Sequence, residues 1–375
     1  MQSNLTKFLN FDQQKAATKT STRGCKWSSS TLKKSLQLHF ACGHTGYNVL
    51  LSHNYSLPSL RTLRRSLENF RFNTGILSEV FTYLAIKVSA MSPQERECCM
   101  TLDEMSITAG VQYDNRNDNF LGGVTLPGHS GTDTHVLVFM LGGITTRWKQ
   151  TIAYYYAGNS TDGRVFADIV IQIIRMCHEI GLNVTAVTSD MGSPNRAMWK
   201  KLGIVIGRGI AAKNSFPHPC NSENNVCILA DVPHLIKNVR NHIVSGQDIV
   251  LPQHIVQRFQ LPSATVSVAP LNRLVKFQEH RDLKPAPRLT SKHLDISHFD
   301  KMKVSQALHV FSHSVSSALR LMVATENWEE NVLTTAWFLE IMNKWFELMT
   351  SRHPGMAFSK FNTDKFSSFV FTYCD

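Results

Sequence analysis

The strongest constraint on the fold is the order of strand-like and helix-like segments between residues 97 and 244. Strand patterns come first, and amphipathic helical patterns then alternate with further strands. The resulting order, β, β, β, α, β, α, β, α, predicts a mixed α/β sheet with helices on its faces. Four early runs are strand-like, CCMTLDEMSI, FLGGVTLPG, HVLVFMLGGITT and WKQTIAYYYAG, and the order counts three strands among them.

Two acidic residues occupy particular places in this order. It is the order of a ribonuclease H-like sheet, in which the first strand lies beside the fourth. Asp103 lies in the first strand and Asp190 ends the fourth, in TSDMGSPNRAMW. Two adjacent carboxylates repel each other unless a cation neutralises them, and Mg²⁺ takes one or two carboxylates plus phosphate oxygens. We therefore expect Asp103 and Asp190 to hold two Mg²⁺ ions.

Simpler interpretations of these acids stay open. Asp103 can be a surface acid at a strand end, and Asp190 can cap the helix expected to start near Ser193. Glu104 alternates to the opposite face of its strand, so we do not expect it to be a ligand. Asp231 precedes VPHLIKN, and a helix cap is its expected role.

The charge of the chain is concentrated at its N-terminal end. The net charge is +11, and residues 1–71 hold eleven Lys and Arg against two acids. A basic segment on a nearly neutral body predicts a polyanionic partner, most simply nucleic acid. A solvated basic tail is the alternative.

Residues 27–71 contain three short helical patterns separated by tight turns. The third pattern, SLRTLRRSLENF, places leucines on one side and arginines on the other. This is the layout of a helix-turn-helix, whose last helix enters the major groove of DNA. An ordinary helical bundle with a basic face is the alternative. The expected DNA-binding residues are Lys33, Lys34, Arg61, Arg64 and Arg65.

Changes in pattern suggest the domain boundaries. We expect a flexible basic tail over 1–26, a connecting helix within 72–98, the sheet domain over 99–244 and a helical domain over 245–375. No apolar run approaches the ~20 residues that span a bilayer, so no membrane partner is expected. Trp328, Trp337 and Trp345 have helical spacing and are expected in the core.

The eight cysteines are sparse for 375 residues and favour a reducing compartment. Cys98 and Cys99 are expected to be buried thiols. The spacing of His218, Cys220, Cys227 and His234 fits no compact zinc motif.

Several segments together resemble the P-element-type transposases and the related THAP-domain proteins. They are WSSSTLKKSLQLHFACGHTGYNVLLSHNYSLPSLRTLRRSL, TLDEMSI, TSDMGSPNRAMW and ADVPHLIKNVRNHI, in this order. The resemblance extends from about residue 8 to the end. It implies a helix-turn-helix and a ribonuclease H-like DDE domain, which a helical GTP-binding insertion interrupts.

The resemblance also assigns residues by position. Asp103 and Asp190 match the first two metal-binding acids of the family, and the third is a glutamate on a helix after the insertion, expected beyond Asp375. A THAP zinc domain and a coiled coil would lie upstream. The chain is therefore expected to be a partial or inactive transposase.

For the insertion, the resemblance implies nucleotide contacts near KMKV. Lys303, Val304 and Ser312 match the stretch that contacts GTP. The family's guanine-reading Asp-x-x-Asn aligns with Glu347 and Thr350, and both of these residues depart from the motif. This departure weakens the expectation that GTP is bound.

The expected function is that of a nuclear DNA transposase, with metal-dependent cleavage and strand transfer. Its expected partner is double-stranded DNA, at transposon ends and at the target, and a homo-oligomer is compatible with it. Two alternatives stay open: a non-catalytic, sequence-specific DNA-binding protein, and a nucleotide-binding regulatory module built on the helical region.

Overall fold

The computed structural model describes residues 9–19, 21–68, 73–115, 118–159, 161–207, 210–295, 297, 300–351 and 353. The predicted boundary near residue 71, the first part of the expected tail and the end of the helical domain lie outside these residues. The chain divides into two compact units, residues 1–229 and 230–375. Each unit is described by itself.

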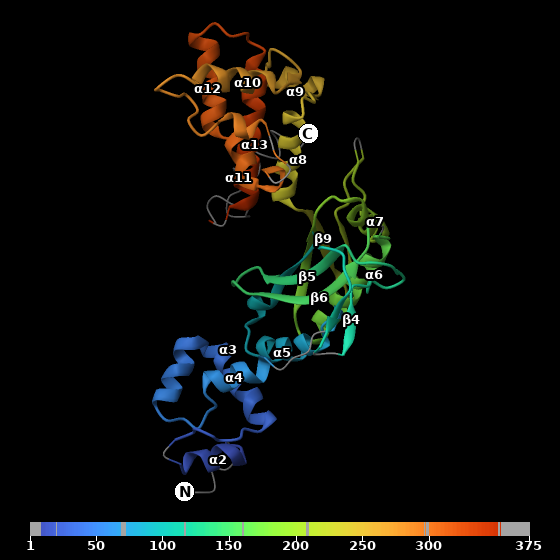
Figure 1. Ribbon diagram of the computed structural model, residues 1–375, viewed down its shortest axis with the longest axis vertical. Coiled ribbons are helices and arrows are strands. Elements are labelled where there is room, and N and C mark those ends of the chain that lie inside the picture. The colour runs from blue at the N-terminus through green and yellow to red at the C-terminus, as the bar shows by residue number, and fades with distance from the viewer. Residues whose placement is uncertain are drawn as a thin grey trace. The chain divides into compact units, whose positions relative to one another are not determined.

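The first unit begins with a small helical bundle (Figure 1). Its helices are α2 (Phe11–Ala17), α3 (Ser29–Ser52) and α4 (Leu60–Glu68). Gly43 interrupts α3 with φ = 70°, a left-handed conformation that favours glycine, and so separates the first two helices expected from the sequence. Leu36, Tyr47, Leu57 and Leu63 form the core of the bundle.

The N-terminal segment is more ordered than the predicted flexible tail. Residues 11–17 are helical, because the Gln13 side chain accepts a hydrogen bond from the Asn10 backbone at the start of α2. The Asp12 carboxylate accepts bonds from the Ser28 backbone N–H and the Thr31 hydroxyl, each at 2.8 Å. These long-range bonds connect α2 to the start of α3, and the composition of the segment does not reveal them.

A short strand and a helix connect the bundle to the sheet. They are β1 (Gly75–Ile76) and α5 (Ser78–Val88), followed by a 3₁₀ turn at Pro93–Arg96. Helix α5 packs against α3, and the Gln37 side chain donates to the Ser89 hydroxyl at 3.0 Å. The predicted connecting helix is therefore present and ends before Pro93.

The centre of the first unit is a seven-stranded mixed sheet with the order β1-β6-β5-β2-β7-β9-β8. Its further strands are β2 (Glu97–Ser106), β5 (His135–Gly143), β6 (Lys149–Ala157), β7 (Asn183–Ser189), β8 (Ser215–His218) and β9 (Asn221–Ala230). Strand β2 pairs antiparallel with β5 and parallel with β7. The predicted adjacency of the first and fourth strands of the pattern is confirmed.

Two details of the strand prediction are wrong. The run FLGGVTLPG does not enter the main sheet, because β4 (Asn119–Leu121) pairs with β3 (Gln112–Asp114) in a separate hairpin. Glycines and Pro127 in this run leave too few residues for a longer strand. Strand β8 was not expected, since its four residues include Pro217 and show no clear alternation.

Helices α6 (Arg164–Glu179) and α7 (Ser193–Lys201) lie beside the sheet and pack against each other (Figure 1). Helix α6 is apolar on one face, where Phe166, Val170 and Ile173 are fully buried. It ends before Gly181, whose φ of 86° supports the predicted stop. The 16 residues of α6 carry a strongly apolar stripe because this face of the helix is buried against the sheet.

The second unit is mostly helical (Figure 1). Its helices are α8 (Val232–Val244), α9 (Gln253–Arg258), α10 (Ala269–Gln278), α11 (Val304–Val310), α12 (His313–Thr325) and α13 (Val332–Thr350). Asp231 caps α8 by accepting from the His234 backbone N–H, as predicted. Trp328 is buried, and Trp337 and Trp345 pack against the same core.

The expectation of an all-helical second domain needs one correction. The strands β10 (Ile249–Val250) and β11 (Thr265–Val266) form a two-stranded antiparallel pair. Two residues are too few to produce an alternating pattern in the sequence. Helices α11 and α12 are separate, because Ser312 leaves the helical region and caps α12. No helix among the described residues is long and apolar enough to cross a membrane.

Candidate functional site

The two predicted metal acids lie just beyond the last paired residues of the neighbouring strands β2 and β7. Thr101 and Thr188 are partners in the parallel register. Asp103 lies two residues further along β2, on the same face as Thr101, and Asp190 directly follows the last residue of β7. The Cys99 thiol and the Thr188 hydroxyl, 3.4 Å apart, lie on this face as well.

Asp190 is partly engaged by the turn that enters α7. Its Oδ1 accepts from the Gly192 backbone N–H at 2.8 Å and from the Asn195 side-chain amide at 2.5 Å. These bonds explain why a short polar acid precedes Met-Gly here. No described residue donates to Oδ2, so one oxygen of the carboxylate stays available. Shaping the turn and binding a ligand are therefore compatible roles for Asp190.

Asp103 and Glu104 present two further carboxylates near Asp190. The Asp103 side chain is exposed, and its Oδ1 accepts from the Glu104 backbone N–H at 2.9 Å. Glu104 keeps an exposed surface, yet desolvation raises the pKa of its carboxyl. The charges of Asp190 and Asp103 raise this pKa further, while His135 opposes them. Glu104 therefore lies within electrostatic reach of both predicted metal acids.

Glu104 is the residue whose position the sequence did not reveal. Strict alternation predicts that Glu104 faces away from Asp103. Asp190, however, lies beyond the last residue of β7, where the chain turns towards α7, and is no longer held by the alternation. The sequence indicated this position of Glu104 only through the adjacent acids Asp103 and Glu104 in the strand-like run CCMTLDEMSI.

These acids suit a hard cation that also binds ligands other than these side chains, such as water or phosphate. Oxygen ligands and uncompensated negative charge favour Mg²⁺ or a similar ion. Within the described residues, no group of three or more His, Cys, Asp or Glu is close enough to hold a metal. A metal bound by Asp103 and Asp190 therefore requires water, phosphate or further residues to complete its coordination. The same finding gives no support to a zinc site at His218, Cys220, Cys227 and His234.

The arginines of α4 lie on two sides of the helix. Arg61 and Arg65 are four residues apart and line one cavity together. Arg64 is not part of this cavity, and its charge is one of the causes, after burial and His44, that lower the pKa of His39 in α3. Lys33 and Lys34 are exposed in the first turns of α3, and Lys34 lies 3.4 Å from the Asn10 side chain.

The residues matched to nucleotide contacts make local interactions. Lys303 forms an ion pair with Asp300 at 2.9 Å, Val304 begins α11, and Ser312 caps α12. On α13, Glu347 accepts from Asn343, and the Thr350 hydroxyl donates to the Phe346 carbonyl. All these partners lie within four residues in the sequence.

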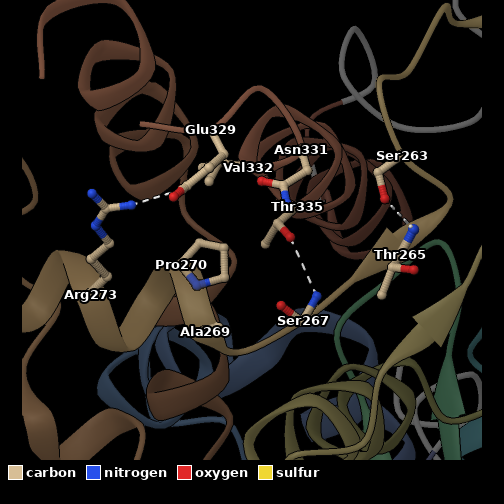
Figure 2. Close-up of a pocket in the computed structure, with 10 residues that line it drawn as sticks. All are labelled: Ser263, Thr265, Ser267, Ala269, Pro270, Arg273, Glu329, Asn331, Val332 and Thr335. Atoms are coloured by element: carbon tan, nitrogen blue, oxygen red, sulfur yellow. Dashed lines mark hydrogen bonds and ion pairs between the residues drawn. The ribbon is translucent and has the colours of Figure 1, made fainter. Parts of the chain in front are cut away.

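A separate pocket of about 260 Å³ lies in the second unit (Figure 2). Ser267 donates its backbone N–H to the Thr335 hydroxyl at 3.4 Å, and Arg273 forms an ion pair with Glu329 at 2.8 Å. Figure 2 shows the Arg273–Glu329 pair to the left of the bond between Thr335 and Ser267. The lining includes none of the residues expected to contact a nucleotide.

Two family models match the chain in sequence order. Residues 72–203 match the "TNP-like, RNase H N-terminal domain", and residues 233–361 match the "TNP-like, GTP-binding insertion domain". Together they cover most of the chain. They support the sheet domain and the insertion that the sequence predicted, including the order of the two.

Individual relatives agree with these models. The chain is 26% identical over 341 residues to the transposable element P transposase of Drosophila melanogaster, covering 91% of this chain and 41% of that protein. It is 26% identical over 304 residues to the DNA transposase THAP9 of Homo sapiens, covering 79% of this chain and 32% of that protein. The chain thus spans less than half the length of these relatives.

A solved structure shares the fold. The Drosophila P element transposase strand transfer complex matches with a TM-score of 0.66 at 23% identity, covering 99% of this chain and 78% of the matched chain. The ribonuclease H-like sheet and the helical insertion are therefore confirmed as the fold.

Proposed function

We propose that this chain, which is similar to the P-element-type transposases, supplies the DNA-binding and metal-binding parts of a nuclear DNA transposase. The reaction would be metal-dependent cleavage at the ends of an element and strand transfer into target DNA. The observation that supports this proposal is the parallel pairing of β2 and β7, whose last partners, Thr101 and Thr188, each lie two residues before Asp103 and Asp190.

In this proposal each acidic residue has a defined task. Asp103 and the free Oδ2 of Asp190 would hold divalent cations, Mg²⁺ being the expected one. A pair of such ions can activate the attacking oxygen and stabilise the leaving oxygen in phosphodiester chemistry. The bonds from Gly192 and Asn195 fix the orientation of Asp190. Glu104 increases the local negative charge and so favours cation binding.

We also propose that residues 233–361 bind GTP, as the description of the matching family model suggests. Lys303, Val304 and Ser312 are the proposed contacts. Binding requires Lys303 to exchange its ion pair with Asp300 for a phosphate. Fluorescent GTP should bind saturably to the wild type, and Lys303→Ala should weaken binding. Lys276→Ala, on α10, is the control and should bind GTP normally.

Nicking of supercoiled plasmid DNA by the full chain tests the proposed cleavage. Nicking should depend on Mg²⁺ or Mn²⁺ and should be lost in Asp103→Asn and in Asp190→Asn. The matched control is Asp168→Asn on α6, since Asp168 is ion-paired with Lys201 at 2.7 Å. This control should retain the activity of the wild type.

The outcomes separate the proposed function from its alternative. If the wild type binds DNA but never nicks it, a non-catalytic DNA-binding protein becomes the better account. If nicking persists in both Asn variants, a contaminating nuclease or a different site is responsible, and the assignment of Asp103 and Asp190 is wrong.

A further inference from the structure

A basic cavity of about 440 Å³ lies between residues 21–27 and the first turns of α4. Its volume is within the range of roughly 300–1,000 Å³ that is typical of ligand pockets. Arg23 comes from the N-terminal segment, and Arg61 and Arg65 come from α4. Hydroxyl side chains, among them Ser21 and Thr22, complete a polar lining.

The three arginines are not neutralised within the described residues. None of them takes part in an ion pair there, and the cavity has no acidic lining residue. The carboxylate of Asp12 is committed to Ser28 and Thr31 at the start of α3. Burial raises the pKa of Asp12, but these hydrogen bonds outweigh it and lower the pKa. Three positive charges around one cavity repel each other, and an anion between them removes this cost.

The position of the cavity indicates which anion it takes. Helix α4 corresponds to the third helix of the expected helix-turn-helix, and the N-terminal part of such a helix meets DNA. Arg61 lies in its first turn, where the helix dipole also favours an anion. Guanidinium groups bind phosphate oxygens through two parallel hydrogen bonds, so arginine suits this ligand better than lysine does.

We propose that Arg23, Arg61 and Arg65 jointly bind one backbone phosphate of double-stranded DNA beside α4. This inference rests on the proposed function, in which the first unit binds DNA, and it adds a site to which residues 21–27 contribute. The segment expected to be a flexible tail thus becomes one wall of the site. Arg64 lies outside it and serves as a matched control on the same helix.

The test measures how DNA binding depends on salt. The full chain is titrated against a short, fluorescein-labelled DNA duplex of mixed sequence by anisotropy at several NaCl concentrations. Each phosphate neutralised contributes about 0.9 to the slope of log affinity against log salt. Arg23→Ala, Arg61→Ala and Arg65→Ala should each weaken binding. The triple variant should lose about 0.9 of the slope, since one phosphate is shared.

Two controls keep the interpretation specific. Arg23→Lys retains the charge and should recover most of the salt slope, although it loses the paired hydrogen bonds. Adding Arg64→Ala to the triple variant should reduce affinity by the same factor as Arg64→Ala does in the wild type, because separate contacts add. Circular dichroism and melting curves identify variants that fail to fold. If Arg23→Ala is one of them, the DNA affinity and salt slope of Arg23→Lys are compared with those of the wild type instead.

Three results would overturn the shared phosphate site. The first is an unchanged affinity and slope in Arg23→Ala. The second is a slope loss of about 2.7 in the triple variant, which means three separate phosphates. The third is a melting shift of the wild type in inorganic phosphate at constant ionic strength, combined with DNA binding that does not depend on Arg23. That result assigns the cavity to a free anion.

Failure of this inference differs from failure of the proposed function. If the wild type does not bind the duplex even at low salt, both fail. If the wild type binds it and Arg23→Ala is neutral, only the cavity assignment fails, and a role in transposition remains open to the nicking test.

Discussion

The two units of the chain position their polar residues in different ways. In the first unit, Asp103 and Asp190 each lie two residues beyond the last partners of the hydrogen-bond ladder between β2 and β7. In the second unit, buried polar side chains hold loops to helices. Gln278 makes three such bonds to Ala286 and Leu289, and Arg240 donates to the carbonyls of Asp300 and Lys301. A site built on a sheet register is therefore visible in the pattern of the chain, whereas one built on side-chain bonds is not.

The largest expected effect breaks the sheet of the first unit. Phe139 in β5 is fully buried and is paired with Leu102 of β2. Phe139→Ala should lower the free energy of unfolding by about 3–5 kcal/mol, because it leaves a cavity beside β2. Urea unfolding followed by circular dichroism measures this change. Phe11→Ala, at a side chain that is 81% exposed, should change it by less than about 0.5 kcal/mol.

The second prediction removes side-chain bonds from the second unit. Gln278→Leu leaves the Leu289 carbonyl and the Ala286 N–H buried without a partner, while the Ala286 carbonyl keeps its bond from the Leu289 backbone N–H. Each such group costs about 1–3 kcal/mol, so a total loss near 3 kcal/mol is expected. Hydrogen exchange should rise in peptides that contain residues 284–290. Gln257→Leu, at an exposed position of α9, should leave this exchange unchanged.

A histidine pair adds a pH dependence to the second unit. His293 Nε2 and His309 Nδ1 lie 2.7 Å apart, and the Thr290 backbone N–H donates to His293 Nδ1. Burial, followed by the charges of His309 and Arg240, lowers the pKa of His293 from 6.5, while the charge of Asp300 acts in the opposite direction.

The sign of this dependence follows from the lowered pKa. As the pH falls, the unfolded chain takes up the proton before the folded chain does. The contribution of neutral His293 to the free energy of unfolding is therefore fully present above pH 6.5, and it is lost as the pH falls from there through the pKa of the folded state. For one proton the slope is at most about 1.4 kcal/mol per pH unit. Unfolding of His293→Asn between pH 7 and pH 5 should show a smaller slope than the wild type. An identical slope would mean that another group titrates.

The smallest effect concerns the exposed bonds at the pocket of Figure 2. The guanidinium of Arg273 lies 4.2 Å from the Trp328 ring centroid and is paired with Glu329. Glu329→Ala should cost less than about 1 kcal/mol, as exposed ion pairs usually do. Arg273→Ala should cost more, by about 0.5–1 kcal/mol, because it also removes the contact with the ring. Thermal melts of both variants and the double variant measure the difference.

The outcome of the sequence predictions follows the same division. The strand order of the sheet was predictable, because alternating runs such as TLDEMSI and NVTAVTSD carry a period of two. The approach of Glu104 to Asp190 depends on the turn after β7, and the contacts of residues 21–27 with α4 depend on tertiary packing. The break between α11 and α12 is not visible in the sequence, since the apolar pattern continues through Phe311 and hides the cap at Ser312.

The most direct test of the central claim is the binding of Mn²⁺ to the full chain, followed by electron paramagnetic resonance with and without a DNA duplex. Mn²⁺ accepts the same oxygen ligands as Mg²⁺. Our account predicts saturable binding to the wild type and to Asp168→Asn, and a loss of at least about tenfold in affinity in both Asp103→Asn and Asp190→Asn. Equal binding by all four proteins, or no binding by the wild type in the presence of DNA, would contradict a metal site at the paired ends of β2 and β7.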